Sequence, residues 1–173
     1  MSELIDKGLI KFLRGGLYIL EFPPESGAEY FIYKIADSYV NTLKFTAEHE
    51  VMMTEENAEI VPSLESARGD VIVVDIDDHS DPVEFARNLW EFAQSKGVAV
   101  VIAVPRGIIP EDVLSKLEFI ADGVIKIEME RRVESIILKF SMPKNIGSTP
   151  ILSFVRFRTN LNRFEIDSRR DIV

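Results

Sequence analysis

Cysteine is absent from the 173 residues, and histidine occurs only twice. The lack of cysteine excludes disulfide bonds, thiolate metal sites and thiol catalysis, and the lack of histidine argues against a histidine-rich metal site. No apolar stretch is long enough to cross a lipid bilayer, and the first residues, MSELIDKGLIKFL, carry too many charges for a secretory signal. We therefore expect a cytoplasmic protein that does not act at a membrane.

The net charge of −9 is distributed unevenly along the chain. Residues 1–130 hold 11 Lys+Arg against 25 Asp+Glu, a net charge of −14, whereas residues 131–173 hold 9 against 4, a net charge of +5. Two interpretations remain open: ordinary solvated faces, or head-to-tail self-association in which the basic end of one copy meets an acidic flank of the next. The overall acidity disfavours nucleic acid as a partner, although the basic end keeps it as a weaker alternative.

The order of predicted elements indicates a single α/β domain over residues 1–173. Strands alternate with helices up to residue 122, which is typical of a parallel sheet with helices on both faces. After residue 123, strands follow strands, which predicts antiparallel hairpins that extend the same sheet. We therefore expect an N-terminal helix over residues 1–14, an α/β core over 15–122 and an antiparallel extension over 123–173.

The most clearly marked elements are two strands and the helix between them. The segments DVIVVDID (70–77) and VAVVIAV (98–104) have continuous apolar runs, as strands buried on both faces do. Asp81 and Pro82 mark the start of a helix that ends before Gly97, with Trp90 among its expected core residues. Apolar residues at helical spacing predict another helix over 30–43. The remaining predicted elements are strands at 17–21, 51–54, 124–129, 133–142, 150–158 and 163–166, a helix at 110–119 and an irregular segment at 57–68.

Residues 15–29, GGLYILEFPPESGAE, combine a buried strand, a proline–glycine turn and the start of a helix. This is the layout of a phosphate-binding loop, whose pattern is a glycine, four residues and then Gly-Lys-Ser/Thr. Here those positions hold Phe22, Gly27, Ala28 and Glu29, so only one glycine matches and both the phosphate-binding lysine and the magnesium-binding hydroxyl are missing. We therefore interpret the loop as vestigial; it comprises Pro23, Pro24, Glu25, Ser26, Gly27, Ala28 and Glu29.

The order of these motifs resembles the RecA-like ATPases, and within them the archaeal KaiC-like group, over residues 12–166. The segment GGLYILEFPPESG is similar to that group's glycine-rich strand and loop, DVIVVDID to its Walker B strand, and IADGVIKIE (120–128) to the segment that starts its terminal hairpins. The resemblance implies a three-layer RecA-like fold. Its central sheet is mainly parallel and flanked by helices, and C-terminal antiparallel strands extend it.

The resemblance also implies roles for individual acids. The segment VMMTEE (51–56) is similar to the strand that ends in water-activating carboxylates, so Glu55 and Glu56 are vestigial catalytic candidates. Asp75 stands at the metal-facing position of the Walker B strand and is a vestigial metal-binding candidate. A divalent ion held by Asp75 together with Asp77 and Asp78 stays open beside the simpler interpretation of a solvated strand end.

Three basic residues are candidates for an interface between subunits. KaiC-like proteins carry a basic triplet, which reaches a neighbour's nucleotide, where this chain has Ser141 to Lys144, and only Lys144 could take its place. Arg156 and Arg158 alternate with apolar residues, as on a strand with one wet face. These two arginines are either an exposed strand face or a contact with an acidic neighbour.

From these residues we expect a non-catalytic, pseudo-ATPase domain that acts through protein contacts as a regulatory or assembly protein, alone as a homo-oligomer or with a protein partner. We expect no ATP hydrolysis and no bound ATP or Mg²⁺. The alternative is an atypical nucleotide-binding protein or weak ATPase in which Lys34, Arg106 or a neighbour's Lys144 supplies the missing cation. The weaker alternative is nucleic-acid binding through the basic C-terminal strands.

Overall fold

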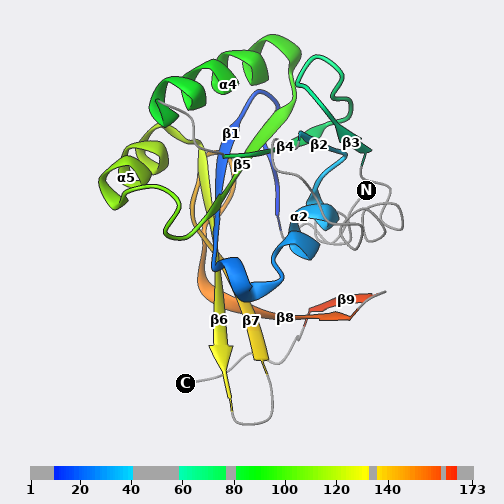
Figure 1. Cartoon of the computed structure of the whole chain (residues 1–173), viewed down its shortest axis with the longest axis vertical. Coiled ribbons are helices and arrows are strands. Elements are labelled where there is room, and N and C mark those ends of the chain that lie inside the picture. The colour runs from blue at the N-terminus through cyan, green and yellow to red at the C-terminus, as the bar shows by residue number, and fades with distance from the viewer. Residues whose placement is uncertain (1–9, 41–58, 77–80, 133–135, 161–162, 167–173) are drawn as a thin grey trace.

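The computed structural model describes residues 10–40, 59–76, 81–132, 136–160 and 163–166. Within these residues the strands form one nine-stranded sheet in the order β3-β2-β4-β5-β1-β6-β7-β8-β9 (Figure 1). The first six strands of this order are parallel, and β7, β8 and β9 join them by antiparallel pairing. The strands are β1 (Leu17–Phe22), β2 (Ser38–Val40), β3 (Glu59–Val61), β4 (Val71–Asp75), β5 (Ala99–Pro105), β6 (Gly123–Arg131), β7 (Ile136–Asn145), β8 (Ile151–Asn160) and β9 (Arg163–Ile166). The helices are the 3₁₀ turn η1 (Pro24–Ser26), α2 (Glu29–Ile35), α4 (Pro82–Lys96) and α5 (Glu111–Ile120).

Helices cover both faces of the parallel part of the sheet, which makes three layers (Figure 1). Side chains alternate along β1, so that Tyr18 belongs to the buried cluster that includes Phe31 of α2. Leu17 belongs to a second buried cluster, with Leu89 of α4 and Leu117 of α5. The three-layer, mainly parallel fold with an antiparallel extension is therefore confirmed.

The boundaries of helix α4 were predicted correctly, but one residue was wrongly assigned to its buried face. The Asp81 carboxylate accepts hydrogen bonds from the backbone N–H groups of Val83 (3.1 Å) and Glu84 (3.0 Å), and the helix ends at Gly97 in the left-handed conformation. Trp90 is 43% exposed, so its assignment to the core was wrong. The residue beside it, Leu89, takes the buried face together with Ala86 and Ala93, and consecutive helical residues point about 100° apart.

The helix predicted over residues 30–43 ends at Ile35, and β2 follows it, so the prediction of helix at 38–40 was wrong. The cause is a set of hydrogen bonds to a distant segment. The Asp37 N–H donates to the Val71 carbonyl (2.9 Å), and the Asp37 carboxylate accepts from the N–H groups of Asp70 (2.8 Å) and Val71 (3.1 Å). These contacts place β2 beside β4 and outweigh the local helical periodicity.

The other differences between prediction and structure are local. Strand β3 lies within the segment predicted to be irregular. Of the expected N-terminal helix, Ile10 to Leu13 are not helical, and residues 1–9 lie outside the described residues, as does the strand expected at 51–54. The C-terminal run of hairpins is confirmed: β6 is parallel to β1 and antiparallel to β7. Across the described part of the chain, no helix has the length and apolar character needed to span a membrane.

Candidate functional site

The vestigial phosphate loop connects the end of β1 to the start of α2, at the edge of the sheet where the parallel strands end (Figure 1). It makes a 3₁₀ turn at Pro24–Ser26 and passes through Gly27 in the left-handed conformation (φ 65°, ψ 26°) before α2 begins. A Cβ at Gly27 would meet no atom within 4 Å, so only its positive φ requires glycine there. The single position that matches the phosphate-loop pattern therefore keeps a clear conformational role.

Hydrogen bonds within the loop use two of its backbone N–H groups. The Ser26 N–H donates to the Pro23 carbonyl (3.0 Å), and the Ala28 N–H donates to the Ser26 hydroxyl oxygen (3.2 Å). The same hydroxyl donates to the Pro23 carbonyl (2.6 Å). Because phosphate loops bind anions with free backbone N–H groups, this loop has fewer donors to offer an incoming phosphate.

The position of the missing lysine faces the protein interior. Ala28 is fully buried and belongs to the cluster that contains Phe31 and Phe140. The most exposed charge described in the loop is instead Glu25, whose carboxylate lies 3.7 Å from Arg131 on β6, with both side chains more than half exposed. The exposed charge described in this loop is thus a carboxylate, whereas a phosphate-binding loop carries an ammonium group.

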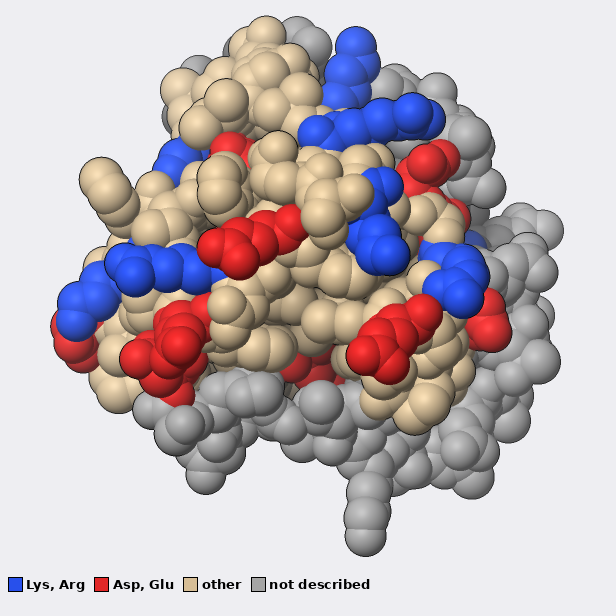
Figure 2. All heavy atoms as spheres, turned by 90° about the horizontal axis from the view of Figure 1, so that it is seen from above, with Lys and Arg blue, Asp and Glu red and all other residues tan. Residues whose placement is uncertain are grey.

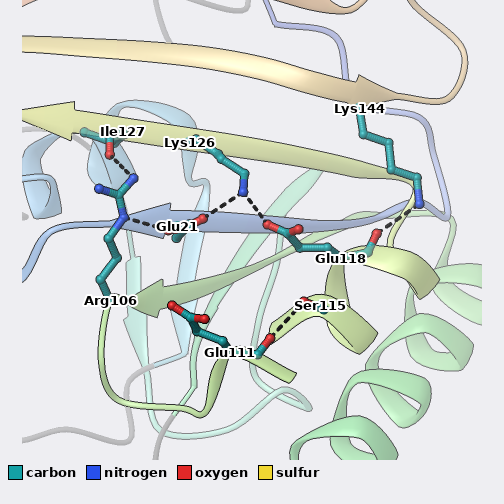
Figure 3. Close-up of polar contacts among 8 residues, drawn as sticks. All are labelled: Glu21, Arg106, Glu111, Ser115, Glu118, Lys126, Ile127 and Lys144. Carbon is teal, nitrogen blue, oxygen red and sulfur yellow. Dashed lines mark hydrogen bonds and ion pairs between the residues drawn. The ribbon is translucent and has the colours of Figure 1, made fainter. Parts of the chain in front are cut away.

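A second charged cluster lies on the opposite face of the sheet, beside α5 (Figure 3). Glu21, the second-last residue of β1, is 8% exposed. One of its carboxylate oxygens lies 2.6 Å from Arg106 Nε and the other lies 3.2 Å from Lys126 Nζ. Lys126 Nζ also lies 2.7 Å from the carboxylate of Glu118 on α5, so two cations and two anions form one continuous chain of ion pairs.

The ion pairs keep Lys126 in its charged form. Burial acts to lower the pKa of Lys126, but its hydrogen bonds and charge interactions with Glu118 and Glu21 outweigh burial and raise the pKa above its ordinary value. The guanidinium of Arg106 is also held in place, because its Nη2 atom donates to the Ile127 carbonyl (3.1 Å) in addition to the Glu21 contact. Arg106, a candidate for the missing cation, is therefore bound to a carboxylate of its own chain.

The predicted acidic candidates are described only in part. Asp75 ends β4 and is 4% exposed, and strand alternation directs its side chain to the same face as Val73, the face covered by α2. Glu55, Glu56, Asp77 and Asp78 lie outside the described residues. The described residues contain no group of three acidic or histidine side chains that could hold a metal ion.

The basic candidates occupy separate places. Lys34 lies in the last turn of α2. Lys144 Nζ donates to the carbonyls of Glu118 (3.0 Å) and Phe119 (2.9 Å), so it binds the C-terminal turn of α5 within its own chain. Arg156 on β8 lies opposite Lys139 on β7, and Arg158 lies opposite Glu165 on β9 in the strand register.

Sequence reasoning missed the Glu21 cluster, although a signal for it was present. Glu21 interrupts the apolar strand LYILEF, and Lys126 interrupts GVIKI. A charged side chain in a buried strand requires a partner of opposite charge, because an unpaired buried charge is costly. A negative charge in one buried strand and a positive charge in another could therefore have predicted that the two strands, β1 and β6, are neighbours in the sheet.

No protein-family model matches the chain, and neither does any curated protein sequence. Solved structures match it over nearly its full length. The flagellar accessory protein FlaH from Methanocaldococcus jannaschii is 15% identical, with 97% of this chain and 96% of that chain covered and a TM-score of 0.74. The KaiC-like protein PH0186 from Pyrococcus horikoshii OT3 is 13% identical, with 90% and 91% covered and a TM-score of 0.67. The resemblance inferred from the motifs is therefore confirmed at the level of the fold: this chain has the RecA-like fold of the archaeal KaiC-like ATPases.

Proposed function

We propose that the chain is a non-catalytic RecA/KaiC-like domain that acts through protein contacts as a regulatory or assembly protein. The observation that carries the proposal is the self-bonded loop, in which Ser26 accepts the Ala28 N–H. A triphosphate site needs free backbone donors, a cation at the terminal phosphates and a magnesium ligand. In this loop two backbone donors are occupied, the lysine position is a buried alanine, and the hydroxyl position is Glu29.

Electrostatics strengthens the argument against ordinary nucleotide binding. A carboxylate within about 4 Å of a phosphate charge costs about 4 kcal/mol at an effective dielectric constant of about 20. The favourable effect of a helix N-terminus, about 0.3–1 kcal/mol, is too small to offset it. With Glu25 on the turn and a glutamate at position 29 of the sequence, such a cost would oppose phosphate binding at this loop.

The alternative of atypical nucleotide binding requires a substitute cation. Among its candidates, Arg106 is engaged by Glu21 and Lys144 by the end of α5. For nucleic-acid binding, a broad field of positive charge would be expected. Figure 2 shows basic and acidic side chains interspersed, with no broad basic field, on the end of the molecule seen there.

An accessory role fits the comparison with solved structures. One of the matching solved structures is that of a flagellar accessory protein. An assembly component of this fold could use the surface around the loop for a protein partner, because no nucleotide would compete for it. The partner of this chain is then a second copy or another protein.

Calorimetric titration with ATP and Mg²⁺, together with thermal unfolding, tests the proposal. A ligand present at 100 times its dissociation constant stabilises a folded protein by about 2.7 kcal/mol, which raises the Tm of a domain of 173 residues by roughly 5–10 °C. We expect no heat of binding and no shift in Tm with 1 mM ATP, and no release of phosphate. Micromolar binding would contradict the proposal. Loss of that binding in Lys34→Gln, Arg106→Gln or Lys144→Gln would then identify the substitute cation.

A further inference from the structure

Four charged side chains connect helix α5 to the end of β1, immediately before the vestigial loop. In order they are Glu118 on α5, Lys126 on β6, Glu21 on β1 and Arg106 after β5, and each neighbouring pair lies 2.6–3.2 Å apart (Figure 3). The Arg106 backbone N–H then donates to the carbonyl of Phe22 at 2.8 Å. Strand β1 is thus joined, directly or through Lys126, to segments that lie at least 85 residues later in the chain.

Of the four side chains, Glu21 is nearly buried and the other three are partly exposed. The side chain of Glu21 is 10% exposed, that of Glu118 27% and that of Lys126 34%. Ion pairs at such depth are screened less than surface pairs, and removal of one member leaves its neighbour without a full counter-charge. Each contact therefore constrains the next one more strongly than an exposed ion pair would.

Both ends of this series of ion pairs are also tied to the protein backbone. At one end, Glu118 lies in the last turn of α5, and Lys144 fixes this turn by donating to the carbonyls of Glu118 and Phe119. At the other end, Arg106 contacts β1 twice, through its side chain to Glu21 and through its N–H to Phe22. A displacement of α5 therefore acts on the residue from which the loop starts.

We propose that these ion pairs are a conformational linkage, through which the position of α5 controls the stability of the loop's attachment to β5. The proposal adds a regulatory route to the proposed function, since a protein contact that moves α5 would change the loop, and a contact at the loop would change α5. Its test uses neither nucleotide nor partner. A failure of the linkage is therefore distinguishable from a failure of the proposed function.

The test is amide hydrogen exchange measured by NMR on the full chain, with the Arg106 amide as reporter. Glu118→Gln should accelerate exchange of this amide by about tenfold, the factor expected when a charge-assisted hydrogen bond is lost. The matched control is Asp112→Asn, which removes an ion pair with Lys116 on the same helix (3.5 Å) between two largely exposed side chains. The control should change the Arg106 rate less than about twofold.

The Val100 amide provides the internal reference, because it donates to Gly16 (2.9 Å) at the opposite end of the β1–β5 pair. Equal acceleration at Val100 and Arg106 would indicate a global loss of stability and would overturn the linkage, as would an unchanged Arg106 rate. A double-mutant cycle gives a second criterion. If the contacts act in series, Glu118→Gln adds little to Lys126→Met, whereas additive effects would overturn the proposal.

Discussion

The Oγ atom of Ser26 lies 3.2 Å from the backbone nitrogen of Ala28 and accepts its hydrogen bond. The Ser26 hydroxyl therefore occupies a backbone N–H group, whereas a phosphate-binding loop keeps such groups free for the anion. Ser26 is only 7% exposed, so water does not readily replace the hydroxyl. The loop can therefore keep its shape without a bound anion.

Replacement of Ser26 by alanine tests this role. Ser26→Ala leaves the Ala28 N–H without its acceptor, which should lower the free energy of unfolding by about 1–3 kcal/mol in urea denaturation. Ser95→Ala is the control, because Ser95 is exposed and its hydroxyl donates to the Phe92 carbonyl within α4. The control should change stability by less than about 0.5 kcal/mol. Equal stabilities for the two variants would show that the Ser26 hydroxyl does not support the loop.

Reintroduction of the missing lysine should damage the protein rather than restore a nucleotide site. Ala28 is fully buried, so Ala28→Lys must place a long chain and an ammonium group against a packed cluster. We expect a loss of about 2–3 kcal/mol in thermal unfolding, with no stabilisation by ATP and Mg²⁺. Glu25→Gln, at an exposed loop position, should stay within about 0.5 kcal/mol of the original stability. A stable Ala28→Lys variant that binds ATP at micromolar concentration would refute the expectation.

Long buried strands could be predicted from the sequence, and short paired strands could not. The apolar run from Val71 to Val74 identifies β4 by itself, because a strand buried on both faces carries few polar residues. In contrast, β2 and β3 have three residues each and are defined by pairing with neighbours. The carboxylate of Asp37 decides the path there by binding backbone N–H groups of the β4 segment, 33 and 34 residues later in the chain. Local periodicity contains no information about such a contact.

In the candidate site, too, features of the local sequence could be predicted and contacts between distant residues could not. Substitutions in a motif are visible in the sequence, so the absence of a lysine and a hydroxyl at these two positions is read directly from Ala28 and Glu29. The use of the loop N–H groups by Ser26 and Pro23 depends on the folded turn. The partner of Arg106 lies 85 residues away, so its engagement by Glu21 could be found only once β1 and β5 were placed side by side.

Glu130 on the β6–β7 hairpin should contribute to stability in a defined pH range. Hydrogen bonds from Lys139 and then Arg132 lower the pKa of Glu130 from 4.5 to about 2. Because the pKa is lower in the folded state than in the unfolded state, the stabilisation is present above pH 4.5 and is lost as the pH falls towards 2. An NMR titration of the Glu130 carboxyl group should therefore give a midpoint near 2.

The same group can be tested through unfolding. The Glu130→Gln variant cannot undergo this protonation, so its Tm should fall less steeply than that of the unmodified chain between pH 4.5 and pH 2. Glu128→Gln, on the same strand and exposed, is the control and should retain the steeper fall. A Glu130 midpoint near 4.5, or identical pH dependence in all three proteins, would show that the two cations do not hold this carboxylate.

The uneven charge of the chain leads to a prediction about self-association. The first 130 residues carry a net charge of −14 and the remainder +5, so copies can attract one another end to end. The range of this attraction is about 10 Å at 0.1 M salt and about 3 Å at 1 M. Light scattering at tens of micromolar protein should show a mass above that of one chain at low salt, which falls as salt is added.

Variants can locate the basic side of that contact. Arg156→Gln and Arg158→Gln should each reduce the mass at low salt if β8 binds an acidic neighbour, and Lys144→Gln tests the third candidate. Lys116→Gln is the matched control, since it removes one positive charge from the acidic part of the chain at a 63% exposed position. Loss of the Lys116 charge should strengthen a contact between the acidic and basic ends of two copies, or leave that contact unchanged. A monomer at low salt would remove self-association from the proposed function and leave a different protein as the partner, because the loop chemistry that argues against nucleotide binding does not depend on oligomeric state.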